Sequence, residues 1–122
     1  MSWTFQQSTG RIVDANGTLL TIGYAGHGAG LDNPADQSIP FVGPLPIGGY
    51  TMDTPINSPR LGGFAIPLIP DASNQEFGRN GFYWHGDNAE HDESASEGCL
   101  VSSLESRQTA WESGDHRLQV IT

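Results

Sequence analysis

The chain has 122 residues and a formal net charge of −9, because fourteen acidic side chains stand against five arginines and no lysine. This charge disfavours nucleic-acid binding, which needs a basic face to neutralise phosphates, and it disfavours attachment to an anionic membrane surface. Glycine and proline are abundant, with 16 and 8 residues, and long helical periodicity is absent from the sequence. We therefore expect one mainly β domain over residues 1–122, rich in turns.

The first half of the chain predicts short strands joined by tight turns. Trp3 and Phe5 alternate with polar residues, which indicates a half-buried strand within residues 2–8. Residues 25–46 predict a long loop rich in glycine and proline, and a loop of that length in a small protein is usually functional. The other expected elements are a strand at 11–13, a hairpin turn at 15–17 and a returning strand at 18–24.

The second half predicts further strands, an acidic loop and one helix. Pro67 indicates an edge position or a bulge for its strand, since proline cannot donate to a sheet ladder. Ser102 and Glu105 have the spacing of a capping box with Ser102 as N-cap, so we expect a helix of about two to three turns that Gly114 ends. The expected strands are 48–52, 64–69, 81–85 and 117–121, and the acidic loop is 86–97.

Cys99 is the only cysteine, so it is either a small buried apolar group or a reactive thiol. Gly98 precedes it and permits a sharp turn that brings main-chain N–H groups close to a bound carbonyl. His85 lies fourteen residues earlier and can act as the base that generates the thiolate. The spacing alone leaves both interpretations open, and the neighbours favour a cysteine nucleophile.

The order of these groups resembles a known enzyme family. A histidine followed by Ser96-Glu97-Gly98-Cys99 is similar to the catalytic motif of the YkuD-like L,D-transpeptidases. Over residues 2–121 the chain resembles the small L,D-transpeptidase effectors that type VI secretion systems deliver. The blocks that carry the resemblance are Gly23-Tyr24-Ala25-Gly26-His27-Gly28, Asn33-Pro34, Gly43-Pro44-Leu45-Pro46-Ile47-Gly48-Gly49-Tyr50, Gly78-Arg79-Asn80-Gly81-Phe82-Tyr83-Trp84-His85-Gly86-Asp87 and Ala95-Ser96-Glu97-Gly98-Cys99-Leu100.

This resemblance implies a fold and a reaction. The fold would be a small β-sandwich or barrel with one short helix after the catalytic cysteine, and no cofactor or metal is implied. The Cys99 thiolate would attack the carbonyl between the L-centre of meso-diaminopimelate and D-alanine in a peptidoglycan stem tetrapeptide, leaving a thioester. Water as acceptor then gives L,D-carboxypeptidase activity, a free D-amino acid gives exchange, and a neighbouring stem amine gives a cross-link.

The resemblance also implies roles for individual residues. His85 would take the thiol proton and later protonate the leaving amine. The backbone N–H groups of Gly98 and Cys99 would form the oxyanion hole. Ser96 would orient the loop or hydrogen-bond the histidine, unless it only caps a turn.

Other positions carry open alternatives. Asp87 either holds the imidazole in the needed tautomer or faces solvent, and Tyr24 either lines the cleft or belongs to the core. The chain departs from the family at Glu97, where a histidine is usual. It also has Leu100-Val101 where an arginine or asparagine is common, so the group that binds a substrate carboxylate is open. Arg79 and Arg107 are the candidates for that role.

Two rival functions follow from the same region. The residues His85, Asp87, His91 and Asp92 can be read as a metal site, although their spacing matches no common ligand pattern. A catalytically inactive domain that binds the cell wall or acts as a scaffold is the other alternative. The acidic residues before Cys99 raise the pKa of a thiol unless they point outward, and they can equally attract a cationic substrate group.

The sequence also predicts where the protein acts. It has no apolar run of about 20 residues, and its start lacks the charged and apolar regions of a secretory signal peptide. We therefore expect synthesis in the cytoplasm without a signal peptide. The resemblance implies delivery to the periplasm of a target bacterium, by a secretion-apparatus carrier or by phage lysis, and a cognate immunity protein as partner.

Overall fold

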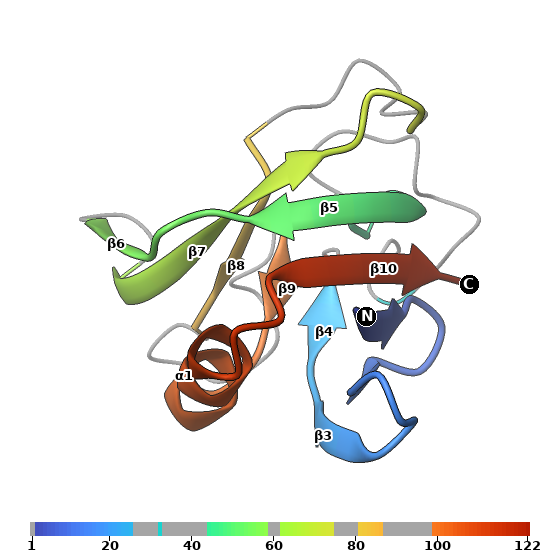
Figure 1. The fold of residues 1–122 in the computed structure, drawn as a ribbon, viewed down its shortest axis with the longest axis horizontal. Coiled ribbons are helices and arrows are strands. Elements are labelled where there is room, and N and C mark those ends of the chain that lie inside the picture. The colour runs from blue at the N-terminus through green and yellow to red at the C-terminus, as the bar shows by residue number, and fades with distance from the viewer. Residues whose placement is uncertain (1, 26–31, 33–43, 59–61, 75–80, 87–98) are drawn as a thin grey trace.

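The computed structural model describes residues 2–25, 32, 44–58, 62–74, 81–86 and 99–122. Figure 1 shows short strands wrapped around a common interior, with a helix on one side. The elements in chain order are β1 (Trp3–Gln6), β2 (Arg11–Val13), β3 (Leu19–Ile22), β4 (Tyr24–Ala25), β5 (Gly48–Met52), β6 (Ile56–Ser58), β7 (Gly62–Pro70), β8 (Tyr83–His85), β9 (Leu100–Val101), α1 (Leu104–Glu112) and β10 (Arg117–Ile121).

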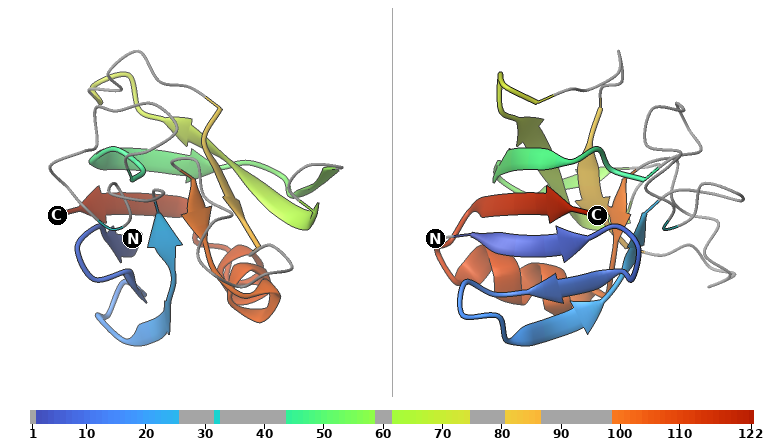
Figure 2. Two further views of the ribbon diagram at one scale, coloured as in Figure 1. Left: turned by 180° about the vertical axis from the view of Figure 1, so that it is seen from behind. Right: turned by 90° about the vertical axis from the view of Figure 1, so that its right-hand side faces the viewer.

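The strands form one strongly curved sheet in the order β3-β2-β1-β10-β5-β7-β8-β9-β4, with β6 added beside β7. The two end strands, β3 and β4, are consecutive in the chain, and only Gly23 separates them. The sheet therefore curls into a nearly closed barrel, which Figure 2 shows from two further directions. The expected mainly β, barrel-like fold with one short helix after Cys99 is confirmed.

Gly23 is the corner at which the two ends of the sheet meet. Its N–H donates to the Gly10 carbonyl at 2.8 Å, next to β2. On the other side, a Cβ at position 23 would lie 2.3 Å from the Val101 carbonyl oxygen on β9. Only a residue without a side chain fits between them. The expected strand over 18–24 is therefore wrong in one respect, because Gly23 divides it into β3 and β4.

Alternate residues of the paired strands fill the core. β1 and β10 pair in parallel, in the register Trp3↔Leu118 and Phe5↔Val120, and all four side chains are buried. The alternation predicted for the first strand and the strand expected at 117–121 are both confirmed. α1 packs against β7 and β8 and buries Ala110. The remaining members of the core cluster are Ile12, Ala25, Leu45, Tyr50, Met52, Ile66, Leu68, Phe82, Trp84 and Leu100.

β7 is an interior strand, so the edge position expected for Pro67 is wrong. It pairs with β8 on one side, and with β5 and then β6 on the other. The Pro67 carbonyl accepts the Asp53 N–H at 2.9 Å, in the gap between β5 and β6. The N–H that proline lacks faces the same gap, because both groups of a strand residue point to one side. A bulge does occur nearby, at Phe64, whose φ is +55°.

α1 begins one residue later than the capping box predicts. Its N-cap is Ser103, whose Oγ accepts the Ser106 N–H at 3.2 Å, so the assignment of Ser102 and Glu105 is wrong. Ser102 is diverted because its Oγ accepts the Trp84 Nε1–H at 2.7 Å. The predicted length of the helix and its end near Gly114, with φ +82°, are confirmed. No helix within the described ranges is long and apolar enough to cross a bilayer.

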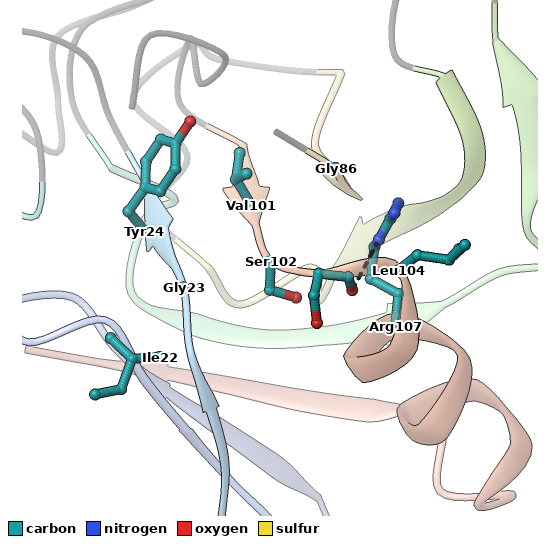
Figure 3. A pocket seen from close by; sticks show the side chains of 9 residues that line it. Ile22, Gly23, Tyr24, Gly86, Val101, Ser102, Leu104 and Arg107 are labelled. Carbon is teal, nitrogen blue, oxygen red and sulfur yellow. Dashed lines mark hydrogen bonds between the residues drawn. The ribbon is translucent and has the colours of Figure 1, made fainter. Parts of the chain in front are cut away.

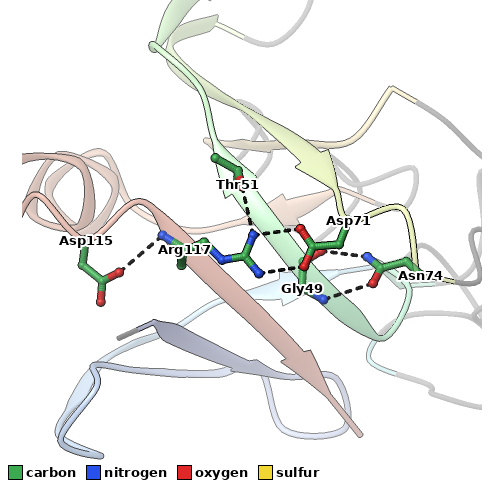
Figure 4. Close-up of polar contacts among 6 residues, drawn as sticks. All are labelled: Gly49, Thr51, Asp71, Asn74, Asp115 and Arg117. Carbon is green, nitrogen blue, oxygen red and sulfur yellow. Dashed lines mark hydrogen bonds and ion pairs between the residues drawn. The ribbon is translucent and has the colours of Figure 1, made fainter.

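A polar cluster ties β10 to β5 and to the segment after β7. Arg117 donates to both carboxylate oxygens of Asp71 at 2.8 and 2.7 Å, and to Thr51 Oγ1 at 2.9 Å (Figure 4). The hydrogen bond from Arg117 lowers the pKa of Asp71. Asn74 exchanges hydrogen bonds of 3.2 and 2.8 Å with the Gly49 backbone. These contacts hold the β5 and β10 side of the barrel together.

Candidate active site

The two predicted catalytic residues are carried by neighbouring parallel strands. β8 ends at His85, and Cys99 directly precedes β9. The register pairs His85 with Val101, and the Ser102 N–H donates to the His85 carbonyl at 3.1 Å. Cys99 is therefore offset from His85 by two positions, about 7 Å along the strand direction. Residues that are fourteen apart in the sequence thus lie on or directly beside two paired strands, two register positions apart.

Strand alternation places His85 on the face of the sheet that points away from the core. Trp84 and Leu100 belong to the core cluster, so His85 and Val101, at the next positions, point to the opposite face. Tyr24 pairs with Val101 from β4 and lies on the same face. All three side chains are buried. The barrel thus aligns Tyr24, Val101 and His85 in one row across three strands.

The backbone sets the tautomer of His85. Its Nδ1 lies 2.8 Å from the Gly86 carbonyl oxygen. A carbonyl can only accept, so this hydrogen bond requires the proton on Nδ1, and Nε2 of the neutral ring is then the basic nitrogen. A main-chain carbonyl therefore performs the orienting role that the sequence suggested for Asp87. Position 87 itself lies outside the described residues.

Cys99 forms no disulfide, and its side chain is buried, with 8% of its surface exposed. Its Sγ lies 3.8 Å from the Gly81 carbonyl oxygen, which suits a weak S–H donor and therefore the protonated thiol. Burial fits an inert cysteine as well as a reactive one. The catalytic interpretation therefore rests on its strand register with His85, and not on its exposure.

A pocket of about 480 Å³ opens beside this row of side chains. Figure 3 shows Tyr24 and Arg107 on either side of Val101, with Gly86 close to the arginine. The lining comes from the β3–β4 corner, the ends of β8 and β9, and the start of α1. Its residues are Ile22, Gly23, Tyr24, Gly86, Val101, Ser102, Ser103, Leu104 and Arg107.

Arg107 is the candidate carboxylate-binding residue that the structure brings to this pocket. It is 4% exposed, and burial lowers the pKa of its guanidinium. Nε donates to the Ser103 carbonyl at 3.3 Å, and Nη1 donates to the carbonyls of Gly63 and Phe64 at 3.3 and 3.2 Å. The bulge in β7 therefore presents the carbonyls that hold this side chain in place. Arg79, the other candidate, lies outside the described residues.

Several predicted site residues fall outside the described part of the chain, namely Asp87, Ser96, Glu97 and Gly98. The same holds for three of the four residues proposed as metal ligands, Asp87, His91 and Asp92. Among the residues that the structure does describe, no group of three or more histidine, cysteine or acidic side chains is arranged to hold a metal ion.

Sequence reasoning missed two groups that build the site. Ser102 accepts the Trp84 Nε1–H and shares a 2.7 Å hydrogen bond with Ser106 Oγ, which joins β8, β9 and α1 below the pocket. The Gly86 carbonyl orients the imidazole. A run of serines before a helix signals only a cap, and a backbone carbonyl leaves no trace in the sequence, so neither role was readable beforehand.

Comparison with known proteins identifies the family. The model of the Tlde1 domain, type VI L,D-transpeptidase effector 1, matches residues 20–121. No protein with a curated description and no solved structure matches the chain. The match spans most of the chain, which therefore belongs to the Tlde1 family. The predicted effector family is thus confirmed, and the YkuD-like nature of the motif stays a prediction.

Proposed function

We propose that this Tlde1-family chain is a cysteine L,D-transpeptidase or L,D-carboxypeptidase that acts on peptidoglycan stem tetrapeptides. The observation that carries the proposal is the hydrogen bond between His85 Nδ1 and the Gly86 carbonyl, on the strand that pairs with the one following Cys99. This hydrogen bond supports an oriented base on the strand paired with the one that Cys99 precedes, and acyl transfer through a covalent cysteine intermediate requires such a base for its thiol.

The reaction proceeds in two halves. His85 Nε2 accepts the thiol proton, and Cys99 Sγ adds to the carbonyl between diaminopimelate and D-alanine. The carbon–nitrogen bond then breaks, the imidazolium protonates the amine of the departing D-alanine, and a thioester remains. In the second half, the neutral imidazole takes a proton from water or from an acceptor amine. The acceptor attacks the thioester carbonyl, and the proton returns to the sulfur as Cys99 leaves.

Mass spectrometry of purified tetrapeptide muropeptides tests this reaction. Incubation with the protein should remove D-alanine, or replace it when another D-amino acid is added, and intact-protein spectra should show an acyl adduct. The Cys99→Ala variant should show neither the product nor the adduct. A folded wild-type protein that binds peptidoglycan without changing any muropeptide would instead favour the inactive binding domain.

The site of action is part of the same proposal. Membership of an effector family supports peptidoglycan as the target and a cognate immunity protein as a partner. We expect toxicity when the chain is directed to the periplasm of a susceptible bacterium and none when it stays in the cytoplasm, because the stem peptides are periplasmic. Equal toxicity in both compartments, or toxicity that persists in Cys99→Ala, would contradict this.

A further inference from the structure

Arg107 is a buried positive charge that forms no ion pair with any described carboxylate. Its three side-chain hydrogen bonds all end on neutral backbone carbonyls, those of Ser103, Gly63 and Phe64. Within the described part of the chain, Nη2 has no hydrogen-bond acceptor. Two N–H groups of a guanidinium that is 4% exposed are therefore available where this side chain lines the pocket.

The pocket gathers a second source of positive potential. Ser103 and Leu104 line it together with Arg107, and they are the N-cap and first residue of α1. The first N–H groups of a helix have no partner within the helix and carry the positive end of its dipole. The guanidinium and the helix start therefore favour the same kind of ligand group, an anion.

The guanidinium also lies next to the proposed base. Gly86 follows His85 directly, and a Cβ on Gly86 would lie 2.9 Å from Arg107 Nη2. Figure 3 shows Arg107 extending from α1 towards Gly86. An anionic group held by Nη2 would therefore lie beside Gly86, the residue whose carbonyl orients the imidazole.

We propose that Arg107 is a specificity-determining residue that binds a carboxylate of the donor stem peptide through Nη2. This inference rests on the proposed function. A charge-assisted hydrogen bond of this kind is stronger than a neutral one, and it gives the buried guanidinium the counter-charge that the described residues do not provide.

The donor stem peptide has two carboxylates that Arg107 Nη2 could bind. One is the terminal carboxylate of D-alanine, which leaves with the first product. The other is the side-chain carboxylate of diaminopimelate, which stays on the thioester. A peptide with a C-terminal amide removes the first, and a peptide with lysine in place of diaminopimelate removes the second while keeping the amine.

The test compares kcat/KM of the wild-type protein on the parent tetrapeptide and on these two analogues. We expect a loss of about 30-fold or more on the analogue that lacks the recognised carboxylate, and a small change on the other. Equal turnover of all three peptides overturns the proposal. A terminal-carboxylate contact should affect only acylation, whereas a side-chain contact should also affect transfer to the acceptor.

Arg107→Gln is the matching protein variant, with Arg11→Gln as the control for loss of one charge, since Arg11 is exposed on β2. On the parent peptide, the kcat/KM of Arg107→Gln should fall by about the same factor as the kcat/KM of the wild type falls on the analogue that lacks the recognised carboxylate. On that analogue, Arg107→Gln should show no further fall in kcat/KM. A second, additive loss overturns the proposal. Thermal unfolding checks that the variant is folded. If it is not folded, the kcat/KM values of the wild-type protein on the three peptides decide the question.

Binding separates this inference from the proposed reaction. Calorimetry with folded Cys99→Ala and the three peptides measures recognition without turnover. If the wild type is inactive and binding still depends on one carboxylate, the subsite holds and the reaction fails. If turnover occurs but neither rate nor binding depends on a carboxylate, the subsite fails and the reaction holds.

Discussion

Arg117 and Arg107 lie in two regions of the same small barrel and meet opposite surroundings. Arg117 is at the surface of β10, where its side chain is 42% exposed and both Asp71 oxygens accept its hydrogen bonds. Arg107 is 4% exposed beneath the start of α1, and backbone carbonyls are its acceptors. One arginine has water and a carboxylate, and the other has neither among the described residues.

This difference underlies our proposal that Arg117 has a structural role and Arg107 a substrate-binding one. An exposed ion pair with good geometry needs no further ligand. If one partner is removed, the other is still solvated, so the loss of stability is small. A buried charge held only by neutral dipoles is costly to fold, and such groups concentrate at sites where a ligand supplies the compensation. The pocket lined by Gly86, Val101 and Arg107 therefore differs from the β5 and β10 surface, because no described carboxylate pairs with its arginine.

The largest effect should come from loss of the proposed catalytic base, His85. His85→Ala removes the base and should lower kcat by about 10³-fold or more, because the thiol then lacks its proton acceptor. His116→Ala is the matched control, since this histidine lies between α1 and β10 and stacks on Trp111, with ring centroids 3.8 Å apart. Turnover of muropeptides measures both. If His85→Ala keeps a tenth of the wild-type activity, His85 is not the catalytic base.

The corner that closes the barrel over the pocket should be nearly as sensitive. Gly23→Ala places a Cβ against the Val101 carbonyl oxygen and should destabilise the fold by about 3 kcal/mol. Gly63→Ala is the comparison, because an added Cβ there meets nothing closer than 3.4 Å. Urea unfolding gives both values. Similar urea midpoints for Gly23→Ala and Gly63→Ala would show that the backbone at Gly23 can shift to accommodate a Cβ at little cost.

A smaller loss is expected below the pocket. Ser102→Ala leaves the buried Trp84 Nε1–H without its acceptor and should cost about 1–3 kcal/mol. Ser8→Ala, which removes an exposed hydroxyl bonded to the chain end, should change stability far less. Thermal unfolding of the two variants beside the wild type checks this. Equal stability would mean that Ser102 does not hold β8 to α1.

The smallest effect belongs to the exposed pair. The folded-state pKa of Asp71 is lowered by Arg117, so its contribution is present above the unfolded pKa and is lost as pH falls through the folded value. Asp71→Asn should therefore flatten the acid side of the stability profile while leaving muropeptide turnover unchanged. Unfolding between about pH 7 and pH 3 measures the slope. Parallel curves of stability against pH for the variant and the wild type would contradict the lowered pKa of Asp71.

Local patterns predicted much of the fold. The alternation of Trp3 and Phe5 with polar residues was enough to place β1, because burial of one strand face repeats every two residues. The short strands β6 and β9 were not predicted from the sequence. Pro67 was misjudged because its missing N–H falls in the gap between two partner strands.

The sequence by itself determined the mainly β class and the helix after the cysteine, and it led to the proposal that Cys99 and His85 form the catalytic pair. These depend on residue type and short spacing, which folding does not alter. Only the tertiary structure decided that Gly23 joins the ends of the sheet and that Arg107 reaches Gly86 and the carbonyls of the β7 bulge. The contacts of Arg107 with the β7 bulge link residues 44 and 43 positions apart. They follow from strand register and barrel closure, which no local pattern encodes.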